Sequence, residues 1–342
     1  MRFLMEDIDS VWNILCSDAK SGHLQGTARR LLNPEGCCPV YAGVRSSDLS
    51  RIIFFNVGKE NLPSRNRFSQ TRAMEVYSGK IPGDNSYAVC LILRDKSFSD
   101  LFSVLAVDIV SEIQDEPGEK AAVKRFVRRI NTWISFFEKF GNSGLTPEKV
   151  RGLYGELWFI RQYLLSSKDR YKKIRGWTGP DGTPHDFQFG KTAFEVKTTA
   201  TKKPWKVKIS NEIQLDDSGI ENLFLYHLAL REIEGGAPTL PDLVDEILDN
   251  LKYTPEIRGY LLDMLLKAGY MEAQKDHYIH KGFIIYEENF YRICDGFPRL
   301  TGKDLPEGTG DINYSVSLAS AGSFITEKEK IDNILGKLSN DI

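Results

Sequence analysis

Two short stretches, Pro184-His185-Asp186 and Phe194-Glu195-Val196-Lys197, decide the fold of this chain. The preceding residues 177–184, WTGPDGTP, are rich in turn formers, so the chain reverses direction there. Residues 186–189 then alternate polar and apolar side chains as a half-buried strand does. Gly190-Lys191 fits a tight turn, and residues 193–199 continue as the return strand. The pattern therefore predicts a β-hairpin.

The hairpin would bring one acid of the first strand to a carboxylate and a lysine of the second. Side chains two positions apart on a strand share a face, so Glu195 and Lys197 point the same way, and Asp186 can meet them across the ladder. Carboxylates hold Mg²⁺ while its shell keeps water and substrate oxygens. A nearby ammonium can orient the attacking water or stabilise developing negative charge. A metal-dependent phosphodiesterase requires this arrangement.

A helix is predicted upstream, from residue 146 to about residue 165. Thr146-Pro147 is a typical N-cap and first-turn pair. Apolar residues then recur at helical spacing, at Val150, Leu153, Leu157, Ile160 and Leu164. Glu156 falls among these apolar positions, where a carboxylate is costly unless something pairs with it. A bound cation or Lys197 would do so.

Four lysines and a tryptophan follow the hairpin in the segment KKPWKVK, residues 202–208. We expect Lys202, Lys203 and Lys206 to contact a nucleic-acid backbone. Residues 209–215 are predicted to be a strand end that passes into a helix carrying Gln214. Residues 223–230 are predicted to be a buried strand of a mixed sheet.

This order of motifs resembles the PD-(D/E)XK nuclease superfamily, which includes many restriction endonucleases, over about residues 146–230. His185 stands where the family name has proline, but Asp186 is in place. The resemblance implies an α/β (α+β) fold, with a restriction-endonuclease-like core whose mixed central sheet is flanked by helices. It also implies an acid on the helix before the hairpin, which Glu156 matches, and a polar residue on the next helix, which Gln214 matches.

The predicted activity is Mg²⁺-dependent hydrolysis of DNA phosphodiester bonds, with Mn²⁺ as a substitute metal. Asp186, Glu195 and the carbonyl of Val196 would hold the metal, and Glu156 would be a further ligand or orient water. Lys197 would assist water attack or stabilise the pentavalent phosphate. The DNA backbone would be held by Gln214 and by Lys202, Lys203 and Lys206.

The whole chain looks like a bacterial branch of the superfamily that is associated with restriction and phage-defence gene clusters. The likeness includes Gly155-Glu156-Leu157-Trp158 and the late Phe297-Pro298-Arg299. It implies partner proteins, an ATPase/helicase or a modification methyltransferase, and cutting of two strands would favour a homodimer. Two alternatives stay open. One is a non-catalytic DNA-binding or scaffold subunit, against which the occupied motif positions weigh, and the other is a repair or junction-resolving nuclease.

Bulk properties limit the choices further. A length of 342 residues predicts two or three domains. The net charge of -2 argues against a wholly basic DNA-coating protein, so any DNA contact needs a local patch. Five scattered cysteines are interpreted as reduced thiols. Early acidic residues argue against a signal peptide, and no apolar run approaches the length of a membrane span. The prediction is a cytoplasmic protein without a membrane contact.

We predict three domains: a β-rich unit at 1–140, the nuclease core at 141–235 and a C-terminal part at 236–342. Strands are expected in the first at residues 39–44, 51–57, 73–77, 87–93 and 101–110, followed by a closing helix at 118–140. That helix carries basic residues that could touch DNA phosphates or form a solvated face: Lys124, Arg125, Arg128 and Arg129.

The C-terminal part is predicted to begin with two amphipathic helices, at residues 239–251 and 255–268. Strands would follow at 283–286, 290–294 and 312–316. The order of elements is compatible with a winged-helix arrangement or with elements that complete the nuclease sheet. Asp276, His277 and His280 are close in sequence, but without further ligands of matching spacing they are interpreted as an exposed loop.

Overall fold

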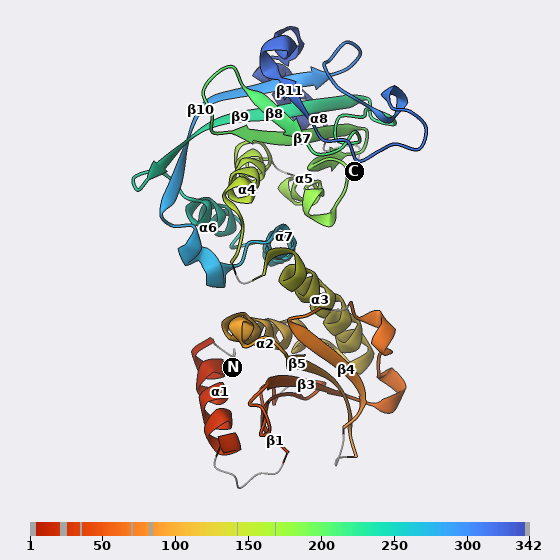
Figure 1. The fold of residues 1–342 in the computed structure, drawn as a ribbon, viewed down its shortest axis with the longest axis vertical. Coiled ribbons are helices and arrows are strands. Elements are labelled where there is room, and N and C mark those ends of the chain that lie inside the picture. Colours follow the sequence, from red (N-terminus) through yellow and green to blue (C-terminus); the bar gives the residue numbers. More distant parts are fainter. Residues whose placement is uncertain are drawn as a thin grey trace. The chain divides into compact units, whose positions relative to one another are not determined.

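A computed structural model describes residues 5–338 except 21–25, 35, 70, 82–84, 142 and 168, and for residues 5–7 the backbone only. The chain divides into two compact units, residues 1–144 and 145–342 (Figure 1). Each unit combines a β-sheet with helices, so the predicted α+β class is confirmed. Residues 236–342 do not form a third compact unit, because their strands join the sheet of the unit that begins at Leu145.

The first unit is built on an antiparallel sheet of strand order β1-β2-β3-β5-β4. Its strands are β1 Thr27–Leu31, β2 Val40–Arg45, β3 Arg51–Val57, β4 Met74–Lys80 and β5 Tyr87–Leu93. Four of them were predicted from alternating apolar residues and turn signals. The predictions missed β1, in which polar and charged residues outnumber apolar ones and most side chains are exposed.

Three helices accompany this sheet: α1 Met5–Lys20, α2 Ser99–Ile113 and α3 Glu119–Phe140. The ring of Phe55 on β3 stacks on that of Phe126 on α3, with centroids 4.2 Å apart. The helix α3 agrees with the predicted closing helix. The predicted strand at 101–110 is wrong, because these residues lie in α2, most of whose side chains are buried. Periodicity alone does not separate a buried helix from a buried strand.

The second unit has a mixed sheet of strand order β12-β10-β9-β7-β6. Its strands are β6 Phe187–Phe189, β7 Thr192–Thr199, β9 Asn222–Glu234, β10 Lys281–Ile293 and β12 Ile325–Thr326. Only β7 and β9 are parallel, from Thr192 beside Asn222 to Thr199 beside Ala229. The two strands predicted at 283–286 and 290–294 are one long strand, β10, with an irregular register between Ile285 and Glu287.

The two faces of this sheet are covered differently. On one side lie the helices α4 Pro147–Phe159, α6 Leu240–Asn250 and α7 Pro255–Ala268 (Figure 1). The ring of Phe159 on α4 contacts Phe187 and Phe194 at centroid distances of 4.5 and 5.1 Å. The other face packs on a two-stranded sheet of β8 Lys206–Ile209 and β11 Tyr314–Ser317, through Val207, Ile209 and Val316. The sheet core therefore lies between two layers.

The remaining elements are short. The helices α5 Arg170–Arg175 and α8 Lys328–Lys337 belong to the second unit, and a π-helical turn, η4 Ile160–Leu164, continues α4. The 3-10 turns are η1 Lys59–Asn61, η2 Arg65–Arg67, η3 Lys96–Phe98, η5 Gly179–Asp181, η6 Glu272–His277, η7 Gly302–Asp304 and η8 Leu318–Phe324. None of the five cysteines forms a disulfide. The strands of the part at 236–342 complete the sheet of the second unit, and a separate winged-helix unit is absent from the described residues.

Candidate active site

The predicted hairpin is present, and it leaves one edge of β7 open. The strand β6 pairs with β7 only from Phe187 beside Phe194 to Phe189 beside Thr192. Past Phe194, no strand among the described residues pairs with this edge. Instead, the Asp186 Oδ2 atom accepts a hydrogen bond from the backbone N–H of Val196 at 2.8 Å. The carbonyl of Val196 points to the same edge, because the backbone N–H and carbonyl of one strand residue both point toward the same neighbouring strand.

Lys197 joins two polar side chains at this edge. Its Nζ atom donates to Glu195 Oε1 at 2.7 Å and to Gln214 Oε1 at 3.2 Å. Glu195 is only 1% exposed, whereas Phe194 and Val196 on the opposite face pack into the core. The alternation expected for a strand therefore places the carboxylate and the ammonium together.

The helix α4 brings Glu156 to the same place because glycine precedes it. A Cβ atom on Gly155 would lie 2.5 Å from Cγ2 of Thr198, so only glycine lets the helix approach β7 this closely. Thr146 caps the helix by accepting from the N–H of Lys149, as its sequence predicts. The Glu156 Oε2 atom accepts a hydrogen bond from Nε1 of the buried Trp177 at 2.7 Å. Sequence reasoning did not predict Trp177 as a site residue.

The turn before the hairpin fixes Asp186 through its backbone. The N–H groups of Thr178 and Gly179 both donate to the Asp186 carbonyl, at 2.9 and 3.0 Å. A Cβ atom on Gly179 would lie 2.8 Å from Asp186 Oδ1, so a larger residue would collide with the carboxylate. The turn-rich sequence thus has a structural role beyond reversing the chain.

Gln214 reaches the site from a turn, so the helix predicted to begin within residues 209–215 is wrong. The Asn211 Oδ1 atom accepts from the N–H groups of Ile213 and Gln214, both at 3.1 Å, which closes a tight turn that competes with a helix. Arg299 holds this turn by donating to the carbonyl of Leu215 at 2.5 Å. Arg299 was part of the family resemblance but was not predicted to support the site.

Three carboxylates share this site with one ammonium, and their pKa values show it. Burial, then the charge of Asp186, raises the pKa of Glu195 to about 8. Burial, followed by the charge of Asp186, raises the pKa of Glu156 well above its usual range. Burial also raises the pKa of Asp186. Burial acts to lower the pKa of Lys197, but Glu195, Asp186 and Glu156 outweigh it, so that pKa is raised.

These charges do not balance, and this decides which ligand the site fits. Were all three carboxylates ionised, they would exceed the single ammonium by two negative charges. The raised pKa values mean that, without a cation, protons relieve this excess. The buried Glu195 Oε2 atom has no hydrogen-bond partner among the described residues. In the described part of the chain, no three or more His, Cys, Asp or Glu side chains are grouped closely enough to hold a metal ion, so the side chains must move to bind one. In chemistry and charge, however, the oxygen donors fit a hard divalent cation.

The predicted backbone-binding lysines lie beside this cluster rather than within it. Lys203 pairs with Glu287 at 2.6 Å, and its Nζ atom lies 4.5 Å from the ring centroid of Trp205. Lys202 and Lys206 are exposed, the first in the loop after β7 and the second on β8. Among the described residues, none of the three forms a hydrogen bond or ion pair with the side chains of this cluster.

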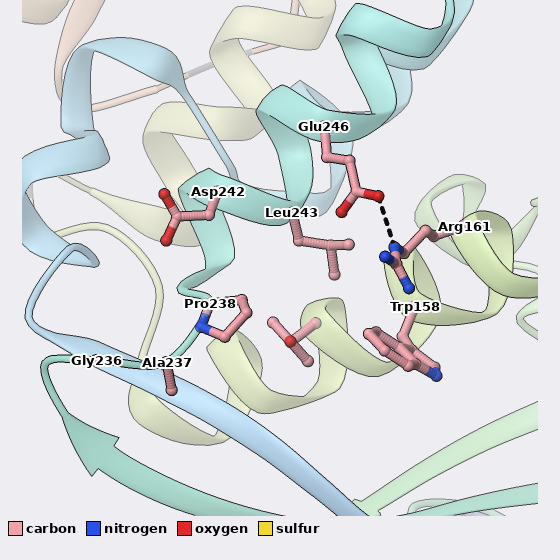
Figure 2. Close-up of a pocket in the computed structure, with 9 residues that line it drawn as sticks. Trp158, Arg161, Gly236, Ala237, Pro238, Asp242, Leu243 and Glu246 are labelled. Carbon is pink, nitrogen blue, oxygen red and sulfur yellow. Dashed lines mark hydrogen bonds and ion pairs between the residues drawn. The ribbon is translucent and has the colours of Figure 1, made fainter.

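A separate pocket of about 520 Å³ lies between α4, α6 and the loop before α6 (Figure 2). Two of its charged residues pair with each other, since Arg161 Nε donates to Glu246 at 2.8 Å. The guanidinium of Arg161 also lies 4.9 Å from the ring centroid of Trp158. No predicted catalytic residue lines this pocket, so we do not place the chemistry there.

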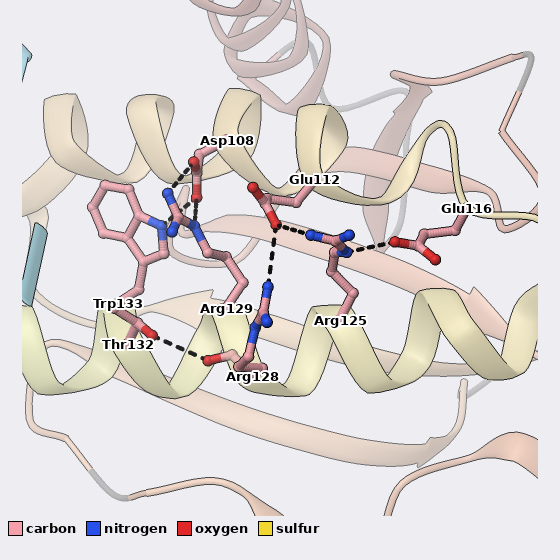
Figure 3. Close-up of polar contacts among 8 residues, drawn as sticks. All are labelled: Asp108, Glu112, Glu116, Arg125, Arg128, Arg129, Thr132 and Trp133. Carbon is pink, nitrogen blue, oxygen red and sulfur yellow. Dashed lines mark hydrogen bonds and ion pairs between the residues drawn. The ribbon is translucent and has the colours of Figure 1, made fainter. Parts of the chain in front are cut away.

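The basic residues of α3 are directed mainly at α2 (Figure 3). Arg129, 8% exposed, donates to both carboxylate oxygens of Asp108 at 2.6 Å. Arg125 pairs with Glu112 and Glu116, and Arg128 lies 3.9 Å from Glu112. These pairs link the two helices within the first unit. The arginines thus have partners inside the protein, and the solvated-face interpretation fits only Lys124 and parts of Arg125 and Arg128.

Two other sequence signals have simple outcomes. Asp276 and His277 end the 3-10 turn η6, and both they and His280 are exposed, as expected for a loop. Among the described residues, no helix is both long enough and apolar enough to cross a membrane.

Comparisons with known proteins agree with this geometry. The model of one family, described as "Putative PD-(D/E)XK family member, (DUF4420)", matches residues 8–319. No curated protein and no solved structure matches the chain significantly. The family match covers both compact units, including the hairpin, α4 and the turn of Gln214. The chain belongs to this PD-(D/E)XK-related family.

Proposed function

We propose that this protein is a Mg²⁺-dependent endonuclease that hydrolyses phosphodiester bonds in DNA. The observation that carries the proposal is the set of Asp186, Glu195 and Glu156 around Lys197 at the open edge of β7. When all three acids are ionised, they exceed the one ammonium by two negative charges, which a divalent cation would compensate. Past Phe194, no strand among the described residues pairs with this edge of β7.

Each residue has a role that its position supports. Asp186, Glu195 and the carbonyl of Val196 would hold the cation, and Glu156, oriented by Trp177, would add a ligand or orient water. Bound there, Mg²⁺, or Mn²⁺ in its place, would polarise the phosphate and acidify a water molecule. Lys197 is placed to orient the attacking water or to stabilise charge on the phosphate. Gln214 positions that ammonium through a 3.2 Å hydrogen bond.

The biological setting follows from the resemblance noted in the sequence. We propose that the protein acts in the cytoplasm within a bacterial restriction or phage-defence system, beside an ATPase/helicase or a methyltransferase. Lys202, Lys203 and Lys206 would hold the DNA backbone, since the overall charge of -2 supplies no general attraction. Cutting of both strands would be achieved by a homodimer, because one such site cuts one strand.

The test compares the wild type with Lys197→Ala on unmodified and modified plasmid DNA, each with Mg²⁺, Mn²⁺ or a chelator. Lys191→Ala is the matched control, because Lys191 lies in the turn of the same hairpin and pairs with Glu221 at 2.7 Å. We expect metal-dependent cutting that Lys197→Ala loses and Lys191→Ala keeps.

Two results would contradict the proposal. Cutting that survives Lys197→Ala would place the chemistry elsewhere. Failure of the wild type to cut any substrate, with DNA bound equally by both proteins, would favour the non-catalytic DNA-binding subunit. Cutting only of branched DNA would favour the repair or junction-resolving nuclease over restriction.

A further inference from the structure

A groove of about 690 Å³ lies at the carboxyl end of β7. The chain from Ala200 to Lys203, directly after β7, forms one side of it. The other sides come from Arg151 on α4, Arg231 and Glu232 on β9 and Tyr286 on β10. Four cationic side chains therefore line a single concave surface.

Two of these cations are available to a ligand. Arg151 pairs with Glu232 at 2.7 Å, and Lys203 pairs with Glu287 at 2.6 Å. Lys202 and Arg231 are exposed, and neither side chain has a hydrogen bond or ion pair with another described residue. The groove thus combines two neutralised pairs with two free positive charges, which suits an anionic ligand.

An exposed aromatic ring stands beside these charges. Tyr286 is 45% exposed and lies at the irregularity of β10, where the register shifts between Ile285 and Glu287. Its hydroxyl donates to the carbonyl of Thr201 at 3.3 Å, and its ring lies 6.0 Å from that of Trp205. Free cations next to an anchored aromatic ring are typical of surfaces that bind single-stranded nucleic acid, because an unpaired base can stack on the ring.

Two elements that carry residues of the proposed catalytic cluster, β7 and α4, also lead to the groove. On the β7 side, Ala200 follows Lys197 by three residues, about 10 Å along a strand. On the α4 side, Arg151 precedes Glu156 by five residues, about 7.5 Å along a helix. One DNA strand carries a phosphate per about 3.4 Å of duplex axis, so a few nucleotides span these distances.

We propose that this groove binds unpaired nucleotides next to the scissile phosphate. The preferred substrate is then DNA with a single-stranded segment beside the cutting site, such as a splayed duplex. Lys202 and Arg231 contact the phosphates, and a base stacks on Tyr286. This inference rests on the proposed nuclease function and specifies its substrate class.

Binding in chelator tests the groove separately from chemistry. Fluorescence anisotropy of the full chain would compare a duplex with a splayed duplex of the same sequence. The groove variants are Tyr286→Ala, Tyr286→Phe and the double variant Lys202→Gln with Arg231→Gln. The matched controls are Tyr253→Ala, a tyrosine that is 84% exposed on the same unit, and Lys330→Gln, an exposed lysine of α8.

We expect tighter binding of the splayed duplex by the wild type. Tyr286→Ala should weaken that binding about tenfold, within the range measured for one stacked base, while Tyr286→Phe and both controls bind as the wild type does. The double variant should weaken binding. The slope of log affinity against log salt concentration should fall by the amount expected for the loss of about two phosphate contacts.

Three outcomes would overturn the inference. If the wild type binds duplex and splayed DNA equally, or Tyr286→Ala binds splayed DNA as well as Tyr253→Ala does, the groove does not select unpaired DNA. In both cases, metal-dependent cutting that Lys197→Ala loses would still support the proposed nuclease. If the wild type neither binds nor cuts DNA, both the inference and the proposed function fail.

Discussion

Two clusters in this protein combine carboxylates with basic side chains, but only one of them is balanced in charge. Between α2 and α3, Asp108, Glu112 and Glu116 face Arg125, Arg128 and Arg129 (Figure 3). At the edge of β7, three carboxylates share one lysine. The first cluster satisfies itself, so its charges join two helices. The second does not, so folding alone gives no reason to keep it.

The difference shows which kind of buried charge indicates function. A balanced pair contributes to structure, because removing one partner leaves the other as an uncompensated charge inside the protein. An unbalanced group of acids raises its own pKa values and lowers stability until a cation joins it. A basic run along a helix is thus a weaker signal than an excess of buried carboxylates.

The largest expected effect is on the unbalanced cluster. Asp186→Asn keeps the shape of the side chain but removes a charge, and it should slow DNA cutting by about 10²- to 10³-fold. The free energy of unfolding in chelator should not fall, because the variant removes repulsion. Plasmid nicking rates and urea unfolding would measure both. Asp181→Asn, in the preceding turn and paired with Lys267, is the control. If Asp186→Asn lost stability but still cut DNA, Asp186 would be a structural residue, and the contrast between the two clusters would fail.

The balanced cluster should respond in stability. Arg129→Met removes the partner of the partly buried Asp108, and we expect a loss of about 3 kcal/mol in the free energy of unfolding of the first unit. Arg125→Met removes a side chain that is 42% exposed, and should cost less than about 1 kcal/mol. Urea unfolding would test the pair. Equal costs for the two variants would show that burial does not separate them.

His227 sharpens the comparison, because it is a buried titratable group that avoids charge. It is fully buried on β9, its Nε2 atom lies 2.9 Å from the Thr199 hydroxyl, and burial lowers its pKa to about 4. The folded state therefore binds fewer protons than the unfolded one between about pH 4 and its ordinary pKa of 6.5. The contribution of His227 to the free energy of unfolding should be fully present above pH 6.5 and be lost as the pH drops to 4, by about 3 kcal/mol in total.

Urea unfolding at several pH values would measure this loss. Relative to the wild type, His227→Gln should lack this contribution of about 3 kcal/mol, and His277→Gln, an exposed histidine on η6, should keep it. An acid dependence that persists in His227→Gln would assign it to other groups.

The smallest expected effect is on the support of Lys197. Gln214→Ala removes a 3.2 Å hydrogen bond to the ammonium, and cutting should slow by about tenfold, equal to roughly 1.4 kcal/mol. Gln188→Ala, an exposed residue of β6, is the control. Single-turnover cutting rates would measure both. A drop as large as that of Asp186→Asn would place Gln214 in the chemistry itself.

The sequence predicted the parts of the site that depend on local pattern. The hairpin, α4 and the buried strand β9 follow from periodicity, turn residues and a helix cap, all within a few residues of each other. Trp177 and Arg299 act through contacts with residues 21 and 84 positions away along the chain. No local pattern reports such contacts.

The errors in the fold have equally physical causes. The helix α2 is buried on nearly all sides, so its apolar residues lose the helical spacing that distinguishes a surface helix. The turn of Gln214 depends on Asn211 binding the backbone, which competes with the apolar spacing used to predict a helix. The single strand β10 was split because polar residues at its irregularity resemble a turn.

The open edge of β7 has a consequence unrelated to chemistry. An exposed strand edge is a template on which a strand of another molecule can add, and this leads to aggregation. The Asp186 carboxylate occupies the N–H of Val196, and its charge repels an approaching backbone carbonyl. One side chain would then protect this edge from pairing as well as serve the proposed reaction. Replacing Asp186 with alanine would remove this protection, so the variant should assemble through the edge of β7 at high concentration.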